Sequence, residues 1–170
     1  FYQKEWIGYS QNKNYLNSLA THDYLLSIDA DEALDSQLKN GIITEKKLGL
    51  KGTYALNRLT NYCGKWIKHS GWYPDVKTRI FSNSNAVWSG EYVHETLEFK
   101  QQTEAKLLAG HLLHYSYYSF VEHRARADKY SALTAIKMNA DGKKASFLKP
   151  YLSALVRFLS MYLFSAGFLD

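Results

Sequence analysis

Tyr24-Leu25-Leu26-Ser27-Ile28-Asp29-Ala30-Asp31-Glu32 is a short apolar run that ends in a cluster of acidic residues. Its length and its polar flanks predict a buried strand. Asp29 and Asp31 then follow the carboxyl end of that strand, where ligands collect in open α/β sheets. Two carboxylates there suit Mg²⁺ or Mn²⁺ carrying a diphosphate. An acidic residue that caps the next helix would give the same pattern, so this motif alone leaves both interpretations open.

The composition is that of one globular domain. The 170 residues are 46% hydrophobic and 15% aromatic, which allows a sizeable core and excludes a disordered chain. The net charge of +5 fits a phosphate-bearing ligand or an anionic membrane surface. Because the basic residues form no dense stripe and no nucleic-acid motif appears, we expect no nucleic-acid partner. The single cysteine, Cys63, favours a reducing compartment and is expected to be a buried small hydrophobe.

The hydrophobic pattern around the acidic motif predicts alternating helices and strands. A helix is expected from about Ser10, with Gln11 and Asn14 three residues apart near its start. Free backbone N–H groups at a helix start favour anionic ligand groups, although both side chains would also suit a solvated helix surface. A second helix is expected from about Ser36, and residues 52–99 are predicted to be mostly strand and turn.

The C-terminal part of the sequence is predicted to be helical. Residues 118–139 form a basic helix, and a further helix carries one apolar stripe of Leu152, Leu155, Val156, Leu159 and Leu163. Lys149 and Arg157 interrupt this apolar stretch, so it is a poor membrane-spanning helix. The stripe would suit an interfacial helix and a helix covering the sheet equally well. We therefore divide the chain into an α/β part, residues 1–117, and a C-terminal helical segment, residues 118–170, that is a candidate for membrane association.

Several short stretches share their order and spacing with one enzyme family: Gln11-Asn12-Lys13-Asn14, Leu26 to Glu32, Gly71-Trp72-Tyr73-Pro74-Asp75, Arg79-Ile80-Phe81, Val93-His94-Glu95 and His114-Tyr115-Ser116-Tyr117. As a set they resemble the family 2 glycosyltransferases, specifically bacterial enzymes that extend lipopolysaccharide core or related surface glycans. The resemblance implies a GT-A fold, which is a Rossmann-like α/β domain. It also implies a nucleotide-diphosphate sugar as donor, Mn²⁺ or Mg²⁺ as cofactor, and a glycan or lipid-linked acceptor.

The same resemblance assigns roles at the reacting groups. Asp29 and Asp31 would hold the metal ion against the diphosphate, or Asp29 would instead contact the ribose. Glu95 lies where the family has its general base, which takes the acceptor proton in an inverting transfer. His114 is a candidate metal ligand or phosphate contact.

Further residues are candidates for binding donor and acceptor. Arg79 would clamp the diphosphate or the acceptor, and His94 would position a phosphate or the acceptor. An arginine paired with a nearby acid and a hydrogen-bonded structural histidine are the alternatives. Gln11 and Asn14 complete the predicted donor site. Trp72 and Tyr73 would stack on an acceptor sugar, although aromatic residues in such a turn often only anchor the loop.

The sequence departs from the family pattern at its start. Relatives begin with a strand–helix–strand segment that holds much of the nucleotide pocket, and we expect this GT-A domain to be truncated at its N-terminus. An uncovered sheet edge would invite a dimer. We expect a cytoplasmic protein, or one bound to the inner face of the cytoplasmic membrane. A non-catalytic fragment that binds acceptor or membrane, and a metal-dependent phosphohydrolase, are the alternative functions.

Overall fold

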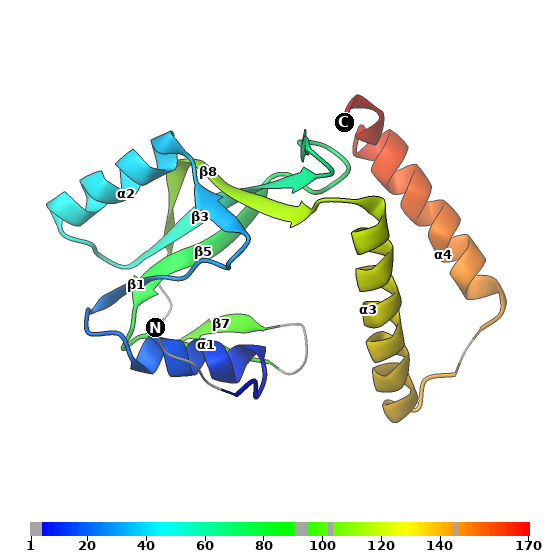
Figure 1. Ribbon diagram of the computed structural model, residues 1–170, viewed down its shortest axis with the longest axis horizontal. Helices are drawn as coiled ribbons and strands as arrows, with labels where there is room; N and C mark the ends of the chain where they lie inside the picture. The colour runs from blue at the N-terminus through cyan, green and yellow to red at the C-terminus, as the bar shows by residue number, and fades with distance from the viewer. Residues whose placement is uncertain (1–4, 91–94, 102–103, 145) are drawn as a thin grey trace. The chain divides into compact units, whose positions relative to one another are not determined.

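The computed structural model describes residues 5–90, 95–101, 104–144 and 146–170 (Figure 1). The protein has mixed α/β structure with helices at its C-terminal end, which confirms the expected fold class and is consistent with a Rossmann-like glycosyltransferase domain. In chain order the elements are α1 (Tyr9–Ser18), β1 (Tyr24–Leu26), β2 (Glu32–Leu34), α2 (Ser36–Leu48), β3 (Thr53–Tyr62), β4 (Lys65–Ile67), β5 (Asp75–Ser82), β6 (Ala86–Ser89), β7 (Thr96–Phe99), β8 (Ala105–Tyr117), α3 (Phe120–Ala140), α4 (Leu148–Leu159), the π-helix η1 (Ser160–Phe164) and the 3₁₀-helix η2 (Gly167–Leu169). The predicted helices near Ser10, Ser36 and residues 118–139 are confirmed.

The larger sheet has the strand order β1-β5-β3-β8-β2, with β4 paired to β3, and β6 and β7 form a second sheet. β1 runs antiparallel to β5, with Leu25 opposite Phe81. β1 lies at one edge of its sheet, and Leu26 is 38% exposed. The expectation of a buried strand is therefore wrong: a strand with a neighbour on one side only keeps part of its surface in solvent.

The chain divides into two compact units. Unit 1 comprises Phe1–Asn57 and Val76–Leu112, and unit 2 comprises Arg58–Asp75 and Leu113–Asp170. Unit 1 therefore holds α1, α2 and the acidic motif, whereas unit 2 holds β4 and all the C-terminal helices. Strands β3, β5 and β8 each contribute residues to both units. The predicted boundary near residue 117 stays a prediction.

Unit 1 contains two clusters of buried apolar side chains. One comprises Leu38, Tyr54, Leu56, Ile80, Leu108 and Leu112, and the other comprises Phe81, Ala86 and Trp88. α1 packs against β6, which carries Trp88. The second cluster thus fixes the position of α1, and α1 carries one wall of the candidate site.

Unit 2 contains a tight hairpin and the C-terminal helices. A tight hairpin joins β3 to β4 through Cys63 and Gly64, whose φ angles are 50° and 90°. Cys63 is half-buried in this turn, so it is not the buried core residue that the sequence suggested.

The C-terminal helices of unit 2 are exposed, and neither α3 nor α4 contains a buried residue. Within the described ranges, no helix combines the length and the apolar character needed to cross a bilayer.

Candidate functional site

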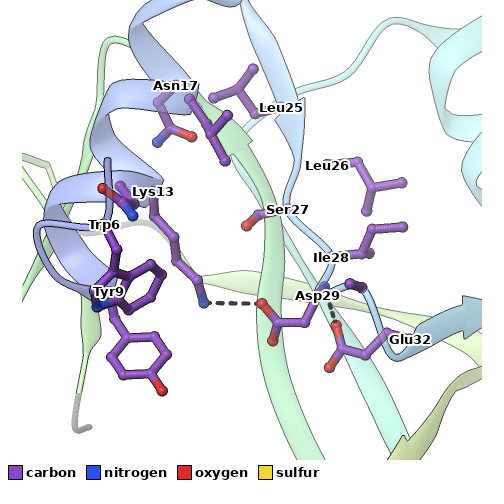
Figure 2. A pocket seen from close by; sticks show the side chains of 13 residues that line it. Trp6, Tyr9, Lys13, Asn17, Leu25, Leu26, Ser27, Ile28, Asp29 and Glu32 are labelled. Atoms are coloured by element: carbon purple, nitrogen blue, oxygen red, sulfur yellow. Dashed lines mark hydrogen bonds and ion pairs between the residues drawn. The ribbon is translucent and has the colours of Figure 1, made fainter. Parts of the chain in front are cut away.

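A pocket of about 910 Å³ lies in unit 1 between α1 and the end of β1 (Figure 2). We call it the α1–β1 pocket. Trp6, Tyr9 and Lys13 line it from the side of α1, and Ile28 and Asp29 line it from the side of β1. Its volume falls within the range of about 300–1,000 Å³ that is usual for small-molecule sites. The acidic motif therefore borders a cavity that is large enough for a ligand.

The acidic motif forms a tight turn. The Glu32 backbone N–H donates to the Asp29 carbonyl oxygen at 3.0 Å, and the Asp29 backbone N–H donates to Glu32 Oε2 at 2.9 Å. This turn places Asp29 at the α1–β1 pocket, whereas Asp31 is half-buried in the turn itself. The following helix, α2, is capped by a different acid, because the Leu38 backbone N–H donates to Asp35 Oδ1 at 2.7 Å. Helix capping thus does not explain Asp29 and Asp31.

Arg79 lies beneath the turn in an ion pair with Glu32. Arg79 Nη2 is 2.7 Å from Glu32 Oε1 and 3.1 Å from Asp29 Oδ2, and the Glu32 side chain has no exposed surface. Arg79 therefore pairs with nearby acids, as one of the two sequence interpretations stated. Losing either partner of such a buried pair would leave an uncompensated charge. The pair therefore holds Arg79 and Glu32 in fixed positions. The predicted contact of Arg79 with a diphosphate stays a prediction.

The ammonium group of Lys13 contacts two of the predicted functional carboxylates, those of Asp29 and Glu95. Its Nζ is 3.2 Å from Asp29 Oδ1 and 3.0 Å from Glu95 Oε1, and it lies 4.4 Å from the centre of the Trp88 ring. Figure 2 shows Lys13 reaching from α1 to Asp29. Burial opposes ionisation of Asp29, but the charges of Arg79 and Lys13 outweigh it and lower its pKa. The site is thus a cluster in which carboxylates alternate with positively charged side chains.

The helix residues predicted for donor binding have other surroundings. The Asn14 amide donates to the Trp88 carbonyl oxygen at 2.7 Å and accepts from the Trp88 backbone N–H at 2.9 Å, which fixes α1 to β6. Gln11 is exposed. The asparagines on the pocket wall are instead Asn12 and Asn17. Asn12 Oδ1 and Asn17 Nδ2 are buried without a hydrogen-bond partner among the described residues, so each is available to a ligand.

The other predicted residues lie in unit 2 or outside the described part of the chain. Trp72 and His114 line a second pocket, of about 400 Å³, in unit 2. Tyr73 does not line it and forms a cis peptide bond with Pro74. His94 lies outside the described residues.

A metal ion at the acidic turn would need ligands from a substrate. Among the described residues, no group of three or more His, Cys, Asp and Glu side chains could hold a metal ion. Mg²⁺, however, is usually held by one or two carboxylates together with substrate phosphates. Asp29 borders the pocket with its two oxygens paired to Lys13 and Arg79, and Asp31 does not line the pocket, so the predicted metal site at these two residues stays a prediction.

The comparisons with known proteins point to one kind of relative. No protein-family model matches the chain. The chain is similar to proteins named uncharacterized glycosyltransferases from Rickettsia prowazekii and Rickettsia typhi, with 27% identity over 153 and 161 residues. Each match covers 84% of this chain and 52% of the relative. A protein of the same description from Rickettsia felis is 27% identical over 164 residues, which cover 84% of this chain and 54% of that protein. The chain thus spans about half the length of the curated relatives it matches.

Sequence reasoning missed residues that the site depends on. Lys13 and the buried Glu32 hold the charged cluster together, and Trp6 and Tyr9 form one side of the pocket. The position of Lys13 inside the motif Gln11-Asn12-Lys13-Asn14, one turn away from Tyr9, was the only available signal.

Proposed function

We propose that the chain is part of a metal-dependent, inverting glycosyltransferase that uses a nucleotide-diphosphate sugar. Distant relatives named as glycosyltransferases support the transferase class. The observation that carries the proposal is the contact of Lys13 with both Asp29 and Glu95 beside the α1–β1 pocket. A donor-side acid and a candidate base then share one site, as sugar transfer requires. The resemblance to family 2 and its GT-A enzymes is part of this proposal.

The α1–β1 pocket offers suitable groups for the donor. The unpartnered amide atoms of Asn12 and Asn17 can bond to polar groups of the donor, whereas the charge of Lys13 is offset by its ion pairs with Asp29 and Glu95. The rings of Trp6 and Tyr9 pack edge to face with their centres 4.7 Å apart, and Trp6 is 61% exposed. An exposed aromatic ring at a pocket wall is suited to a nucleotide base.

The chemical step would be divided between the two ends of the charged cluster. Asp31, with Asp29, would hold Mg²⁺ or Mn²⁺. When bound, the ion would neutralise the leaving diphosphate as a Lewis acid. Glu95 would take the proton of the acceptor hydroxyl, which then attacks the anomeric carbon from the face opposite the leaving group. Lys13 would hold the Glu95 carboxylate in place through the contact to Oε1.

A lipid-linked acceptor would bring the protein to a membrane surface. The apolar stripe on α4 is solvent-exposed, with Leu152 and Leu155 at 63% and 56%. A helix with such a stripe and with basic residues beside it suits the interface of an anionic membrane. The proposal thus includes a cytoplasmic protein that can bind the inner face of the cytoplasmic membrane. The edge position of β1 would also allow a dimer through strand pairing.

The proposal predicts donor binding that depends on metal and on Asp31. Calorimetric titration of the chain with a panel of nucleotide-sugars should give binding of one donor in Mn²⁺ and at least tenfold weaker binding without it. Asp31→Asn should remove the effect of Mn²⁺, because a neutral amide is a poor ligand for a hard cation. Asp23→Asn is the matched control, since Asp23 is exposed at the other end of β1. Equal metal dependence in both variants would overturn the assignment of Asp31.

A further inference from the structure

The side chain of Asp170 lies against a loop of unit 2 that surrounds it with hydrogen-bond donors. Residues 68–71 belong to the connection from β4 to β5, and we call them the carboxylate loop (Figure 1). The Lys68 backbone N–H donates to Asp170 Oδ1 at 2.9 Å, and the His69 backbone N–H donates to Oδ2 at 3.0 Å. His69 Nδ1 lies 3.0 Å from Oδ1, and the Ser70 hydroxyl donates to Oδ2 at 3.2 Å. Two backbone groups and two side chains therefore converge on one carboxylate.

The backbone of the carboxylate loop has an unusual conformation. Ser70 and Gly71 have φ angles of 57° and 72°. A residue with a Cβ atom rarely takes such an angle and keeps it only where its surroundings hold it there. Turns of this kind direct successive backbone N–H groups to one side and so form a concavity that binds anions. The carboxylate of Asp170 occupies such a concavity.

The C-terminal turn, residues 165–170, approaches this loop with its backbone as well. The Ser70 backbone N–H donates to the Ser165 carbonyl oxygen at 2.9 Å. Ala166, with a φ of 50°, turns the chain from η1 into η2. A Cβ atom on Gly167 would lie 2.6 Å from Ser70 Oγ, so the absence of a side chain at Gly167 allows this approach. The turn and the loop thus have complementary shapes.

The surroundings of Asp170 stabilise its charged form. Its side chain is only 10% exposed. Burial opposes its ionisation, but the hydrogen bonds from Lys68, His69 and Ser70 outweigh it and lower its pKa. Asp170 is therefore held as a carboxylate, in the manner of an anionic ligand in its site.

This contact also attaches α4 to the strands of unit 2. α4 continues directly into η1, and the C-terminal turn follows η1. Helices in proteins are stabilised mostly by packing, and no residue of α4 is buried, so the contacts at its C-terminal end matter for its position. We propose that the carboxylate loop is a binding site for a carboxylate group, with Asp170 as its intramolecular ligand, and that the two form a releasable latch on the C-terminal helices. This inference does not rest on the proposed glycosyltransferase activity.

The test removes the ligand and then supplies it in free form. ¹H–¹⁵N spectra are recorded for the full 170-residue chain and for its Asp170→Ala variant. The substitution should move the amide signals of Lys68 and His69 and should lower the ¹H–¹⁵N nuclear Overhauser effects of residues 160–169, because the released turn gains motion. Sodium acetate should return both amide signals saturably toward their wild-type positions. It should not restore the nuclear Overhauser effects, because free acetate fills the site without tethering the turn.

Three results would overturn the proposal. Amide signals that keep their wild-type positions in Asp170→Ala would show that Asp170 is not the ligand. Signals that move but do not respond to acetate would show that the loop is no carboxylate site. Unchanged nuclear Overhauser effects would show that the contact is no latch.

The matched control is Asp141→Ala, which removes an exposed carboxylate from the same unit. Its loop signals should keep their wild-type positions and should not respond to acetate. The wild type should not respond either, because its own carboxylate competes as a tethered ligand at high effective concentration. Sodium chloride at the same ionic strength separates binding from screening. An equal response to acetate in the control and in Asp170→Ala would place acetate elsewhere and overturn the site.

A second variant opens the latch without removing the ligand. In Gly167→Ala the added Cβ atom would also lie 2.6 Å from the Met161 carbonyl oxygen, a backbone atom that cannot rotate away. The Lys68 and His69 signals should move as in Asp170→Ala, and acetate should again return them. Wild-type positions in Gly167→Ala would overturn the close docking of the turn, and well-dispersed spectra establish that each variant is folded.

Inorganic phosphate is the second anionic probe in both variants. It should return the signals less than acetate does, because the loop binds the two oxygens of a planar group. A return with phosphate alone would overturn the assignment of the site to a carboxylate.

Discussion

At the scale of single residues, three acids in one short motif have three different environments. Asp29 borders a pocket and contacts Lys13, Glu32 is buried against Arg79, and Asp31 is half-buried in the turn. The sequence places all three after the same strand and treats Asp29 and Asp31 as equivalent ligands. Glu32 is the acid that turns inward, where it pairs with Arg79 and accepts a hydrogen bond from the Asp29 backbone N–H, and neither contact can be read from the sequence.

The environment of Asp29 predicts a dependence of stability on pH. Burial opposes its ionisation, but Arg79 and Lys13 lower its pKa below the usual value of 3.8. A carboxyl whose pKa is depressed by folding binds protons more readily when unfolded. Its contribution to stability is therefore complete above the unfolded pKa and is lost as pH falls through the folded pKa. From about pH 4 downward, the free energy of unfolding should fall more steeply for the wild type than for Asp29→Asn.

Urea unfolding at a series of pH values measures this difference. Asp23→Asn provides the control, since Asp23 is exposed and has the same acid-to-amide change. The control should follow the wild-type slope from neutral pH down to about pH 3, the interval in which a depressed carboxyl begins to titrate. An Asp29→Asn variant that follows the wild-type slope as well would show that the contacts to Lys13 and Arg79 do not stabilise the fold.

At the scale of elements, the close contact between α2 and β8 shows what a sequence cannot reveal. Asp35 caps α2 and also accepts the His111 backbone N–H of β8 at 2.8 Å. Gly110, next to His111, has a φ of 97°, and a Cβ atom there would lie 2.6 Å from Asp35 Oδ1 and would also collide with the Leu38 backbone nitrogen. The start of α2 was predictable from its pattern, but the approach of β8 to that start was not.

Gly110→Ala should therefore destabilise the protein strongly. A left-handed conformation costs a residue with Cβ about 1–2 kcal/mol, and overpacking adds about 1–3 kcal/mol. The expected loss in the free energy of unfolding is about 2–5 kcal/mol, measured by urea denaturation. Gly142→Ala separates the two effects, because Gly142 has a φ of +68° but a Cβ atom added there would have no neighbour within 4 Å. It should lose only about 1–2 kcal/mol, and equal losses in both variants would argue against the close packing.

At the scale of the whole molecule, the sequence predicted which helices and strands the chain forms better than it predicted which residues lie in the same unit. The helices and the strand-rich middle follow from hydrophobic periodicity, which is a local property. The division into two units is not local: it separates the predicted ligands Asp29 and Asp31, in unit 1, from Trp72 and His114, in unit 2. Lys13 was missed for a related reason. A lysine on a helix is ordinarily solvated, and only the tertiary placement of Glu95 beside it reveals a role.

The C-terminal helix gives a prediction for the behaviour of the molecule as a whole. No residue of α4 is buried, and its apolar stripe is exposed, with Leu159 at 37% as the least exposed of its members. Arg157 and Lys149 add positive charge beside the stripe. The chain should sediment with vesicles that contain anionic phosphatidylglycerol, more weakly with neutral phosphatidylcholine vesicles, and less in high salt.

Removing part of the stripe tests whether α4 is the contact. The double variant Leu152→Ser and Leu155→Ser should partition into anionic vesicles at least tenfold more weakly, because two side chains together lose several apolar groups at about 0.8 kcal/mol per buried CH₂. The matched control carries Val121→Ser and Ile136→Ser on α3, where both side chains are exposed, at 80% and 67%. The control should sediment as the wild type does. Equal loss in both double variants would mean that exposed apolar surface in general drives the binding, and no loss in either would mean that charge alone does.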